Sequence, residues 1–422
     1  MTSQIVLINQ AGIGIASDTL VSREEGSNRH KTFPSSNKIY ELGGDHKVVV
    51  LHSGSTMIGG INYGLLIREW ALQQTNPLPA LADYPRQFEN WLANYRKLSI
   101  DEENEIYDSL CSSFGYFSKS LTQELQESIN LLEYEEDILP LQIQQELVSA
   151  IKKYAEDTYV DEKPFVDLNE ASILKTIRLQ ERGVIEHFLE HLALVVGKDN
   201  VNWEPTLVIN EAIEYFVVQR LLHWNWNPNQ ASLNFVGFGS DEPIGGKVEV
   251  TVGGFYLNRL RSRISSRDPE PSSAEVYIGT IAQDEAMADF IRGLDINRQE
   301  AYIEIAREKA TDIFLGSEPS NESSEKVDSF IESLNEAINE TLWDNYTLPF
   351  RRTLRALSLH SLVLFSEALV KLQSLRSATA PGEATVGGII ESLSIDRVQG
   401  IEWHTRSKDT NYQIGTSPHP FM

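Results

Sequence analysis

Short runs of apolar, β-branched residues, separated by turns that contain glycine, open the chain. This alternation of apolar runs and glycine turns is typical of antiparallel β-hairpins. The pattern predicts two hairpins, one made by residues 4–8 and 13–17 and the other by residues 38–42 and 47–52. The polar stretch 19–36 lies between the hairpins and predicts a loop.

Helical spacing of the apolar positions begins at about Met57. A first helix is predicted from Leu65, Leu66, Trp70 and Leu72, and a second from Phe88, Trp91, Leu92 and Tyr95. Beyond them, residues 100–230 consist mainly of charged, amphipathic runs. We therefore interpret 100–230 as a helical insertion, with helices expected over 106–132, 137–158, 169–196 and 210–224.

Strand patterns return in the second half of the chain. They are expected at residues 231–238, 247–252, 274–280, 385–395 and 398–403, and residues 255–257 extend the second of these. Residues 296–356 are polar and helical, with a Ser/Glu/Asn-rich linker at 317–326, and 357–375 is a strongly apolar helix. These patterns predict one discontinuous core, 1–99 with 231–422, interrupted by helical insertions at 100–230 and 296–356.

The predicted elements imply an α+β fold. Two antiparallel sheets can bury one face against each other and the opposite face against helices. Helices follow each set of strands, so that both outer faces can be covered. The expected architecture is a four-layer αββα sandwich that carries added helical insertions.

Composition narrows the classes of function. The chain has 422 residues, a net charge of −25 and one cysteine, Cys111. Such an acidic surface repels nucleic acid and anionic lipid. No apolar run is long enough to span a membrane, and we see no secretory signal. A single cysteine excludes internal disulfides and cysteine-based zinc sites. We therefore expect a cytoplasmic protein that binds neither nucleic acid nor membrane.

The first eighteen residues carry the candidate chemistry. Thr2 follows the initiator Met1 directly, and Asp18 ends the second apolar run. Removal of Met1 would give Thr2 a free α-amine beside its hydroxyl. A nucleophile and its own base then sit on one residue. The reference pKa of an α-amine, about 7.7–8.0, leaves a useful neutral fraction near neutral pH.

These residues resemble the proteasome β-subunit family of N-terminal-nucleophile hydrolases, which includes the HslV-type protease subunits. In that family an Asp follows the mature Thr after sixteen residues, as Asp18 follows Thr2 here. A Lys then opens the next strand, matched by Lys38 in Lys38-Ile39-Tyr40-Glu41-Leu42, and a small-Gly-small turn is matched by Ser53-Gly54-Ser55.

The second half matches the family less closely. The family has Gly-Ser-Gly before its third helix and an Ala five residues after that Ser. This chain has Gly279-Thr280-Ile281, with Ala286 six residues after Thr280. The family also has an Asp before a small-Gly-Gly turn, where this chain has Glu383 before Val386-Gly387-Gly388.

The resemblance implies a role for each of these residues. Thr2 would be the nucleophile, and Lys38, paired with Asp18, would lower the pKa of its neighbours. The Gly54 N–H would form the oxyanion hole, while Thr280 and Glu383 would order the amine and its water. The specificity pocket would be lined by Val21, Ser22, Ser36, His52 and Thr56.

The resemblance thus implies a threonine-type endopeptidase that acts on peptides or unfolded proteins without a cofactor. It would work in a homo-oligomeric ring, fed by a separate ATP-dependent unfoldase. A second interpretation is a catalytically silent member of the fold that serves assembly or binding.

A third interpretation rests on the pattern His187-x-x-Glu190-His191, that of inverted zinc peptidases. Two histidines four residues apart share one helix face and can bind a metal, with Glu190 nearby as a base. The competing explanation, which we favour, is an amphipathic helix that binds no metal.

Overall fold

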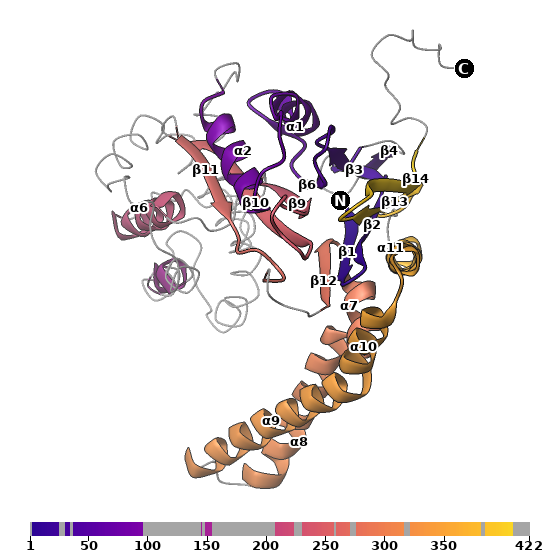
Figure 1. Ribbon diagram of the computed structural model, residues 1–422. Coiled ribbons are helices and arrows are strands. Elements are labelled where there is room, and N and C mark those ends of the chain that lie inside the picture. The colour runs from indigo at the N-terminus through magenta and orange to yellow at the C-terminus, as the bar shows by residue number, and fades with distance from the viewer. Residues whose placement is uncertain are drawn as a thin grey trace.

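The computed structural model contains both helices and strands, and the strands form two large sheets (Figure 1). The structure describes residues 2–24, 30–33, 37–95, 145, 148–153, 207–222, 230–256, 259–270, 276–315, 321–380 and 385–407. The sequence-based expectation of a mixed α and β fold is confirmed at this level.

The first sheet has five antiparallel strands in the order β12-β1-β2-β13-β14. Its strands are β1 (Ser3–Asn9), β2 (Gly12–Asp18), β12 (Tyr277–Ala282), β13 (Ile390–Asp396) and β14 (Gly400–Thr405). Its register places Ser3 opposite Ala282, Gln4 opposite Ser17, and Asp18 opposite Ile390. The sheet therefore joins the first eighteen residues to strands that lie beyond residue 276.

The second sheet also has five antiparallel strands, in the order β11-β10-β9-β6-β5. They are β5 (Ile39–Glu41), β6 (Val48–Gly54), β9 (Ala231–Gly237), β10 (Gly246–Tyr256) and β11 (Arg259–Ile264). Pairing of Gly54 with Ala231 joins β6 to β9 across the long segment 55–230. Two small ribbons, β3 (Val21–Glu24) with β4 (His30–Phe33) and β7 (Met57–Ile58) with β8 (Ile61–Asn62), complete the described strands.

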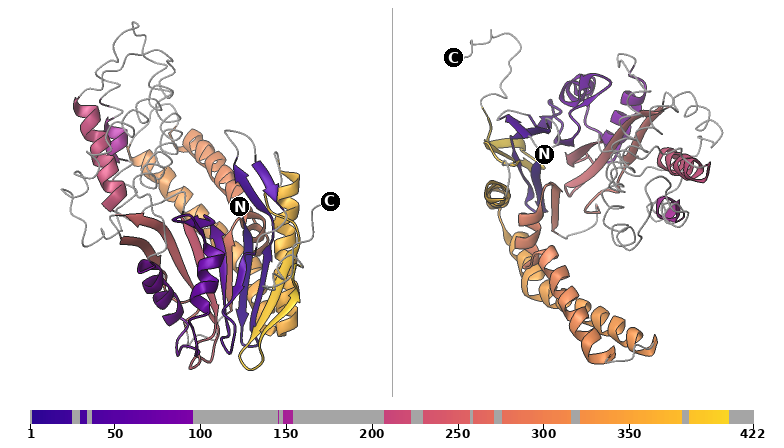
Figure 2. Two further views of the ribbon diagram at one scale, coloured as in Figure 1. Left: turned by 90° about the horizontal axis from the view of Figure 1, so that it is seen from above. Right: turned by 180° about the vertical axis from the view of Figure 1, so that it is seen from behind.

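Apart from a short helical stretch at 148–153, the described helices fall into three groups. After β8 come α1 (Tyr63–Ala71) and α2 (Asp83–Ala93), and α6 (Leu207–Leu222) precedes β9. After β12 come α7 (Glu285–Arg292), α8 (Ile296–Leu315), α9 (Asn321–Leu342), a π-helical turn (Trp343–Thr347), α10 (Leu348–Ala356) and α11 (Leu359–Thr379). Figure 2 shows α8 and α9 side by side, extending away from the sheets.

Three hydrophobic clusters bury both faces of each sheet. The first lies between the sheets, where Ile13 and Ile15 share a cluster with Val49 and Val236. The second joins Val50 and Phe235 to α1 and α2 through Trp70 and Phe88. The third joins Ile5 and Leu7 to Leu362 and Val370 of α11. Burial on both faces explains why residues 5–8 of β1 form a continuous apolar run rather than an alternation of apolar and polar residues.

Several sequence-based boundaries are corrected. Residues 19–36 include the ribbon β3–β4 where we expected only a loop, and 259–264 form a strand that we did not expect. Helix α9 begins at Asn321, inside the expected linker 317–326, and β13 begins only at Ile390.

Of the apolar residues assigned to the first helix, Leu65 and Leu72 are exposed. Leu66 and Trp70 are buried instead, because the buried stripe faces the second sheet.

Trp70 anchors the cluster between the second sheet and its helices. Its ring makes edge contacts with Phe88 and Phe235, at centroid distances of 5.3 and 5.9 Å. We predict that Trp70→Ala lowers the free energy of unfolding by about 3–5 kcal/mol, because it leaves a large cavity. Leu72→Ala, two residues away but 88% exposed, should change it by less than about 0.5 kcal/mol. Urea denaturation of both variants tests this, and equal effects would contradict the assigned core.

Candidate functional site

Antiparallel pairing brings several strand ends to one end of the two sheets. In the first sheet, β1 begins where β2 and β12 end. In the second sheet, β5 begins where β6 ends, at Gly54. The residues Thr2, Asp18, Lys38 and Gly54, which the sequence singles out, all belong to these strand ends. The fold therefore places the candidate residues of both sheets at a common end.

A buried ion pair joins the two sheets at this end. The Lys38 Nζ lies 2.6 Å from Asp18 Oδ1, and both side chains are almost completely buried. Lys38 also donates to the Leu20 carbonyl at 2.7 Å. The same Asp18 Oδ1 accepts from the Ser3 N–H at 2.9 Å, and Oδ2 accepts from the Gly387 N–H at 3.2 Å. The carboxylate thus has donors on both oxygens, as a buried charge requires.

Burial changes the proton affinity of Lys38. Removal from water lowers the pKa of its ammonium below 10.5, and the neighbouring Asp18 carboxylate, through its charge and hydrogen bond, opposes this effect. A smaller opposing effect comes from Glu391, a buried residue of β13. Lys38 is therefore held in place by an anion and is easier to deprotonate than a solvent-exposed lysine.

Thr2 lies directly beside this pair. Its residue is only 7% exposed, and its carbonyl accepts from the Gln283 N–H at 2.9 Å. The next residue, Ser3, is fixed to Asp18 through its N–H. The peptide unit between Thr2 and Ser3 is thus hydrogen-bonded through both its carbonyl and its N–H, to the segment after β12 and to the end of β2. This arrangement gives Thr2 a defined position.

Gly54 ends β6 in a conformation that favours glycine. Its φ is +83°, and a Cβ at this position would lie 2.3 Å from the Gln230 carbonyl oxygen. Both the left-handed backbone and the close contact exclude a side chain. Gly54 itself is solvent-exposed, as is Thr56 just beyond it. The end of β6 therefore offers accessible backbone beside the candidate site.

His52 is a buried, neutral histidine. Its Nε2 lies 2.8 Å from the Ser55 carbonyl oxygen, which can only accept, so Nε2 carries the proton. Its ring lies 5.4 Å from that of Tyr63. Burial lowers the pKa of His52 to about 4; the Ser55 carbonyl opposes this shift, and the Lys38 charge adds to it. His52 is therefore uncharged near neutral pH.

Gln4 connects the two halves of the site and was not identified from the sequence. Its Nε2 lies 3.1 Å from Ser17 Oγ and 3.4 Å from the carbonyl oxygens of both Lys38 and His52. The residue is completely buried. One amide group therefore ties β1 of the first sheet to β5 and β6 of the second.

Thr280 does not have the expected neighbours. The register places it opposite Ile5, two pairs along the strand from Ser3, and its hydroxyl donates to the Asp284 carboxylate. The residue that bonds Thr2 is Gln283. The resemblance implied that Thr280 orders the α-amine and its water, whereas the bond to the Thr2 carbonyl is made by the Gln283 backbone N–H, which has no sequence signature.

A second hydrogen-bonded chain supports Gln283. Its Oε1 accepts from the Thr385 hydroxyl at 2.9 Å. Ser377 Oγ of α11 in turn accepts from the backbone N–H groups of Thr385 and Val386, at 2.9 and 3.2 Å. Gly387 follows and donates to Asp18. The segment 385–387 thus links Gln283 to Asp18, a role we had not assigned to Thr385 or Ser377.

Other sequence-based candidates lie outside the described residues. They are Ser36, Glu383, His187, Glu190 and His191, together with the side chains of Val21 and Ser22. Among the residues that the structure describes, no group of three or more His, Cys, Asp or Glu side chains could hold a metal. None of the helices within the described residues is long and apolar enough to cross a membrane.

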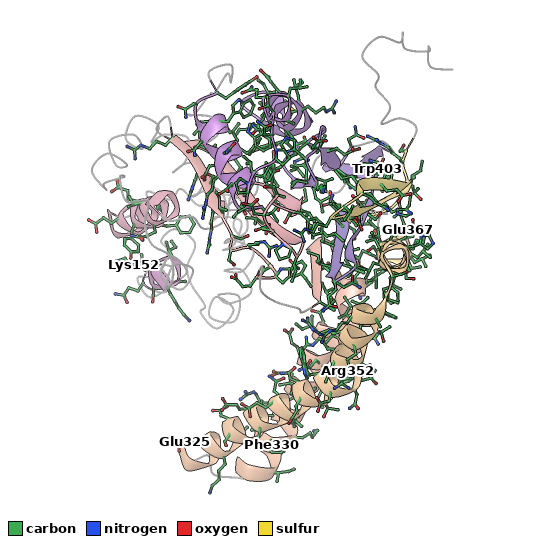
Figure 3. The ribbon with its side chains drawn as sticks, viewed as in Figure 1. Lys152, Glu325, Phe330, Arg352, Glu367 and Trp403 are labelled. Carbon is green, nitrogen blue, oxygen red and sulfur yellow. The ribbon has the colours of Figure 1, made fainter. Side chains whose placement is uncertain are left out.

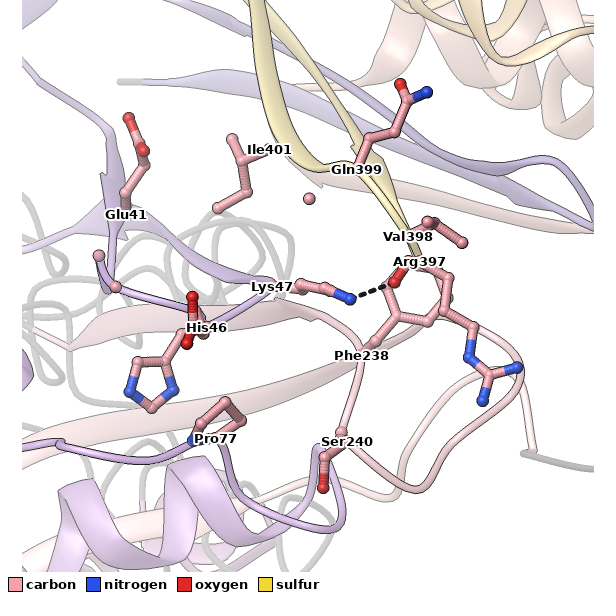
Figure 4. Close-up of a pocket in the computed structure, with 15 residues that line it drawn as sticks. Glu41, His46, Lys47, Pro77, Phe238, Ser240, Arg397, Val398, Gln399 and Ile401 are labelled. Atoms are coloured by element: carbon pink, nitrogen blue, oxygen red, sulfur yellow. Dashed lines mark hydrogen bonds between the residues drawn. The ribbon is translucent and has the colours of Figure 1, made fainter.

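Two cavities lined by the described residues lie beside the core. One of about 790 Å³ lies between α11 and the start of β13 and includes Leu20, Gly387 and Gly388, so it adjoins the Asp18–Gly387 contact. The other, of about 670 Å³, lies at the opposite end of the sheets, between the turn before β6 and the turn between β13 and β14 (Figure 4). There Lys47 donates to the Arg397 carbonyl. Neither Thr2 nor Asp18 lines this second cavity.

Comparisons with known proteins add no family assignment: no family model matches the chain, and no curated protein is similar to it in sequence. The candidate site therefore rests on its own geometry.

Removal of one partner of the Asp18–Lys38 pair should strongly destabilise the fold, because the other charge is then buried without a partner. We predict that Asp18→Asn or Lys38→Met each lowers the free energy of unfolding by about 3–5 kcal/mol, since the remaining charge stays buried. The double variant should lose less than the sum of the two. Arg86→Ala, which removes an exposed partner 3.9 Å from Asp83, should change stability by less than about 1 kcal/mol. Additive losses in urea denaturation would contradict the coupling.

His52 should make the protein sensitive to mild acid. Its pKa is about 4 in the folded chain and 6.5 when unfolded. Between these values the unfolded chain binds a proton that the folded chain does not, so stability falls as the pH falls from 6.5 towards 4. Between pH 7 and 5 this effect amounts to ~2 kcal/mol.

The variant His52→Gln keeps an N–H donor and removes this titration. We expect the stability of wild type to fall by ~2 kcal/mol more than that of the variant between pH 7 and 5. Denaturation at several pH values measures both curves. Parallel curves for wild type and variant would show that His52 is protonated normally in the folded state.

Proposed function

We propose that this chain is a threonine-type endopeptidase of a proteasome-like assembly, with Thr2 as nucleophile after removal of Met1. The observation that carries the proposal is the buried Lys38–Asp18 pair, with Asp18 also bonded to the Ser3 N–H beside Thr2. A buried charge pair costs desolvation energy and is weak evidence for stability alone. Its position beside a hydroxyl-bearing residue near the chain start favours a chemical role.

The architecture supports the same proposal. Two antiparallel sheets face each other across one hydrophobic cluster, and helices pack on the outer face of each through two others. This arrangement is compatible with the four-layer αββα sandwich of N-terminal-nucleophile hydrolases. In that fold, the nucleophile lies at one end of the two sheets, where Thr2 lies here.

The proposed mechanism begins with the α-amine that Met1 removal exposes. The neutral amine accepts the Thr2 hydroxyl proton, directly or through one water, as Oγ1 attacks the peptide carbonyl carbon. The Lys38 charge favours the neutral amine and the developing alkoxide, and the Gly54 N–H donates to the carbonyl oxygen as it becomes negative. The amine then gives its proton to the leaving nitrogen, and the C–N bond breaks to leave an ester on Thr2.

Water completes the cycle. The amine accepts a proton from a water molecule whose oxygen attacks the ester carbonyl, and the C–O bond to Thr2 breaks with return of the proton to Oγ1. Peptide and water are the only reactants, so no cofactor is needed. Gln283, through its bond to the Thr2 carbonyl, keeps the residue in one orientation throughout.

The alternatives make different predictions. A catalytically silent protein of this fold would keep the Lys38–Asp18 pair for structure and would not react at Thr2. The Thr280 hydroxyl donates to Asp284, a contact that the resemblance did not imply, and this feature favours the silent alternative. A zinc hydrolase would depend on His187, Glu190 and His191, and would contain zinc in stoichiometric amount.

We predict that a β-lactone or peptide epoxyketone forms a covalent adduct on Thr2. Mass spectrometry of the native protein should show that Met1 is absent, and peptide mapping should place the adduct on the N-terminal residue. Thr2→Ser should still react, since it keeps the hydroxyl and the amine. Thr2→Ala should lose the adduct and at least about 100-fold of peptidase activity.

Retention of Met1 in active protein would contradict this mechanism, because an amide nitrogen cannot act as the base. Hydrolysis that survives in Thr2→Ala and disappears with a metal chelator would instead support the zinc site. Absence of both adduct and hydrolysis in correctly processed protein would support the silent alternative.

A further inference from the structure

The helices α8 and α9 form a long antiparallel hairpin that projects from the sheets (Figures 1 and 2). The apolar cluster between them is small, with Ala310, Val327 and Ile331 buried at its centre. Arg307 and Asp328 form an ion pair along one side of the contact. A two-helix hairpin with so little internal core offers most of its surface to solvent.

One outer face of α8 is apolar and basic. Tyr302, Ile305 and Ile313 are 58%, 54% and 76% exposed. At 3.6 residues per turn they lie within about 80° of one another, and Arg298 and Lys309 fall within the same arc. Lys309 also forms an exposed ion pair with Asp312 at 3.4 Å, which a partner's carboxylates would have to replace or share. We call these five residues the α8 face. Scattered exposed apolar residues are ordinary, but an aligned set on one helix marks a contact surface.

The far side of α9 is acidic. Glu325, Glu332, Glu336 and Glu340 lie within about 80° of one another by the same helical geometry, on the side away from Val327 and Ile331. All four are exposed, and within the described residues none of them forms a salt bridge. Trp343, 47% exposed, ends this strip. We call the four glutamates and Trp343 together the α9 face. Figure 3 marks its first residue, Glu325.

We propose that copies of this chain associate through the hairpin, with the α8 face of one copy on the α9 face of the next. The charges are complementary, and their spacing agrees: Arg298 and Lys309 are eleven residues apart, as are Glu325 and Glu336. Opposite charges at matched spacing fix the register of two helices. The apolar side chains of the α8 face and Trp343 supply area that becomes buried.

The two faces differ, so this contact is heterologous. Each copy contacts one neighbour through its α8 face and another neighbour through its α9 face. Repetition of this contact generates a closed ring or an open filament rather than an isolated pair. A second copy fits better than an anionic membrane, because the acidic α9 face on the same hairpin would be repelled by the lipid. The inference rests on the hairpin alone and does not depend on the chemistry at Thr2.

Charge reversal tests the contact in the full-length chain. Variant A is Arg298→Glu with Lys309→Glu, and variant B is Glu325→Lys with Glu336→Lys. Each alone should reduce association at least tenfold, because like charges then meet. A mixture of A and B should restore it, since both contacts in an alternating A–B assembly again join opposite charges. Light scattering coupled to size-exclusion chromatography measures the mass in each case.

A matched control uses other exposed acids of α8. Glu300 and Glu308 lie outside the α8 face, so Glu300→Lys with Glu308→Lys should leave the assembled mass unchanged. Helical content from circular dichroism should be the same for all variants. Association of the wild type should also weaken between about 0.01 M and 1 M salt, as the Debye length falls from about 30 to 3 Å.

Three outcomes would overturn the proposal. The first is a wild type that stays monomeric at micromolar concentration and low salt. The second is assembly of variants A and B as strong as that of the wild type, and the third is a mixture of A and B that fails to restore assembly. Binding of the wild type to anionic vesicles in place of self-association would assign the α8 face to a membrane instead. A covalent adduct at Thr2 in a monomeric protein would refute the hairpin contact and leave the proposed peptidase standing.

Discussion

The buried ion pair between Asp18 and Lys38 is the constraint on which the candidate site depends. Two charges removed from water are tolerated only when their remaining hydrogen-bonding groups find partners. Asp18 finds them in the backbone N–H groups of Ser3 and Gly387, and Lys38 in the Leu20 carbonyl. The hydrogen bonds and ion pair of this one carboxylate therefore fix three segments. They are the start of β1, the segment before β13, and the start of β5, where Lys38 lies. Thr2 acquires its position as a consequence of this requirement.

Hydrophobic burial brings these groups close enough to interact. The strands that meet at the site come from the beginning of the chain, from the region around residue 280 and from its last part. Each sheet buries both faces, so its strands cannot slide by one residue without moving apolar side chains to the wrong side. Gln4 adds a polar connection between the sheets where the apolar cluster ends. The core thus determines register, and register determines which polar groups meet.

Sequence patterns predicted the features that depend on side-chain type, and missed those that depend on backbone geometry. The apolar runs of β1, β2 and β6 were evident, and the spacing of Thr2, Asp18 and Lys38 pointed to residues that the structure brings together. Strand β11 was missed because Arg259–Ile264 carries three arginines and exposes part of its surface. Gln283 was missed because it reaches Thr2 through its N–H, a group that every residue but proline has. Glu383 and the His187 motif lie outside the described residues and stay predictions.

Charge is distributed unevenly in this molecule, and the distribution constrains its ligands. The chain carries a net charge of −25, yet at the candidate site Lys38 is balanced by Asp18, and burial lowers the pKa of His52 to about 4. For the proposed peptidase, a locally balanced site beside the exposed Gly54 suits a neutral peptide backbone better than a charged ligand. The cations of α8, in contrast, belong to an acidic protein and attract acidic surfaces. The acidic α9 face on another copy of the same hairpin is one such surface. Substrate binding and association would therefore rely on different forces, and salt should affect association more than substrate binding.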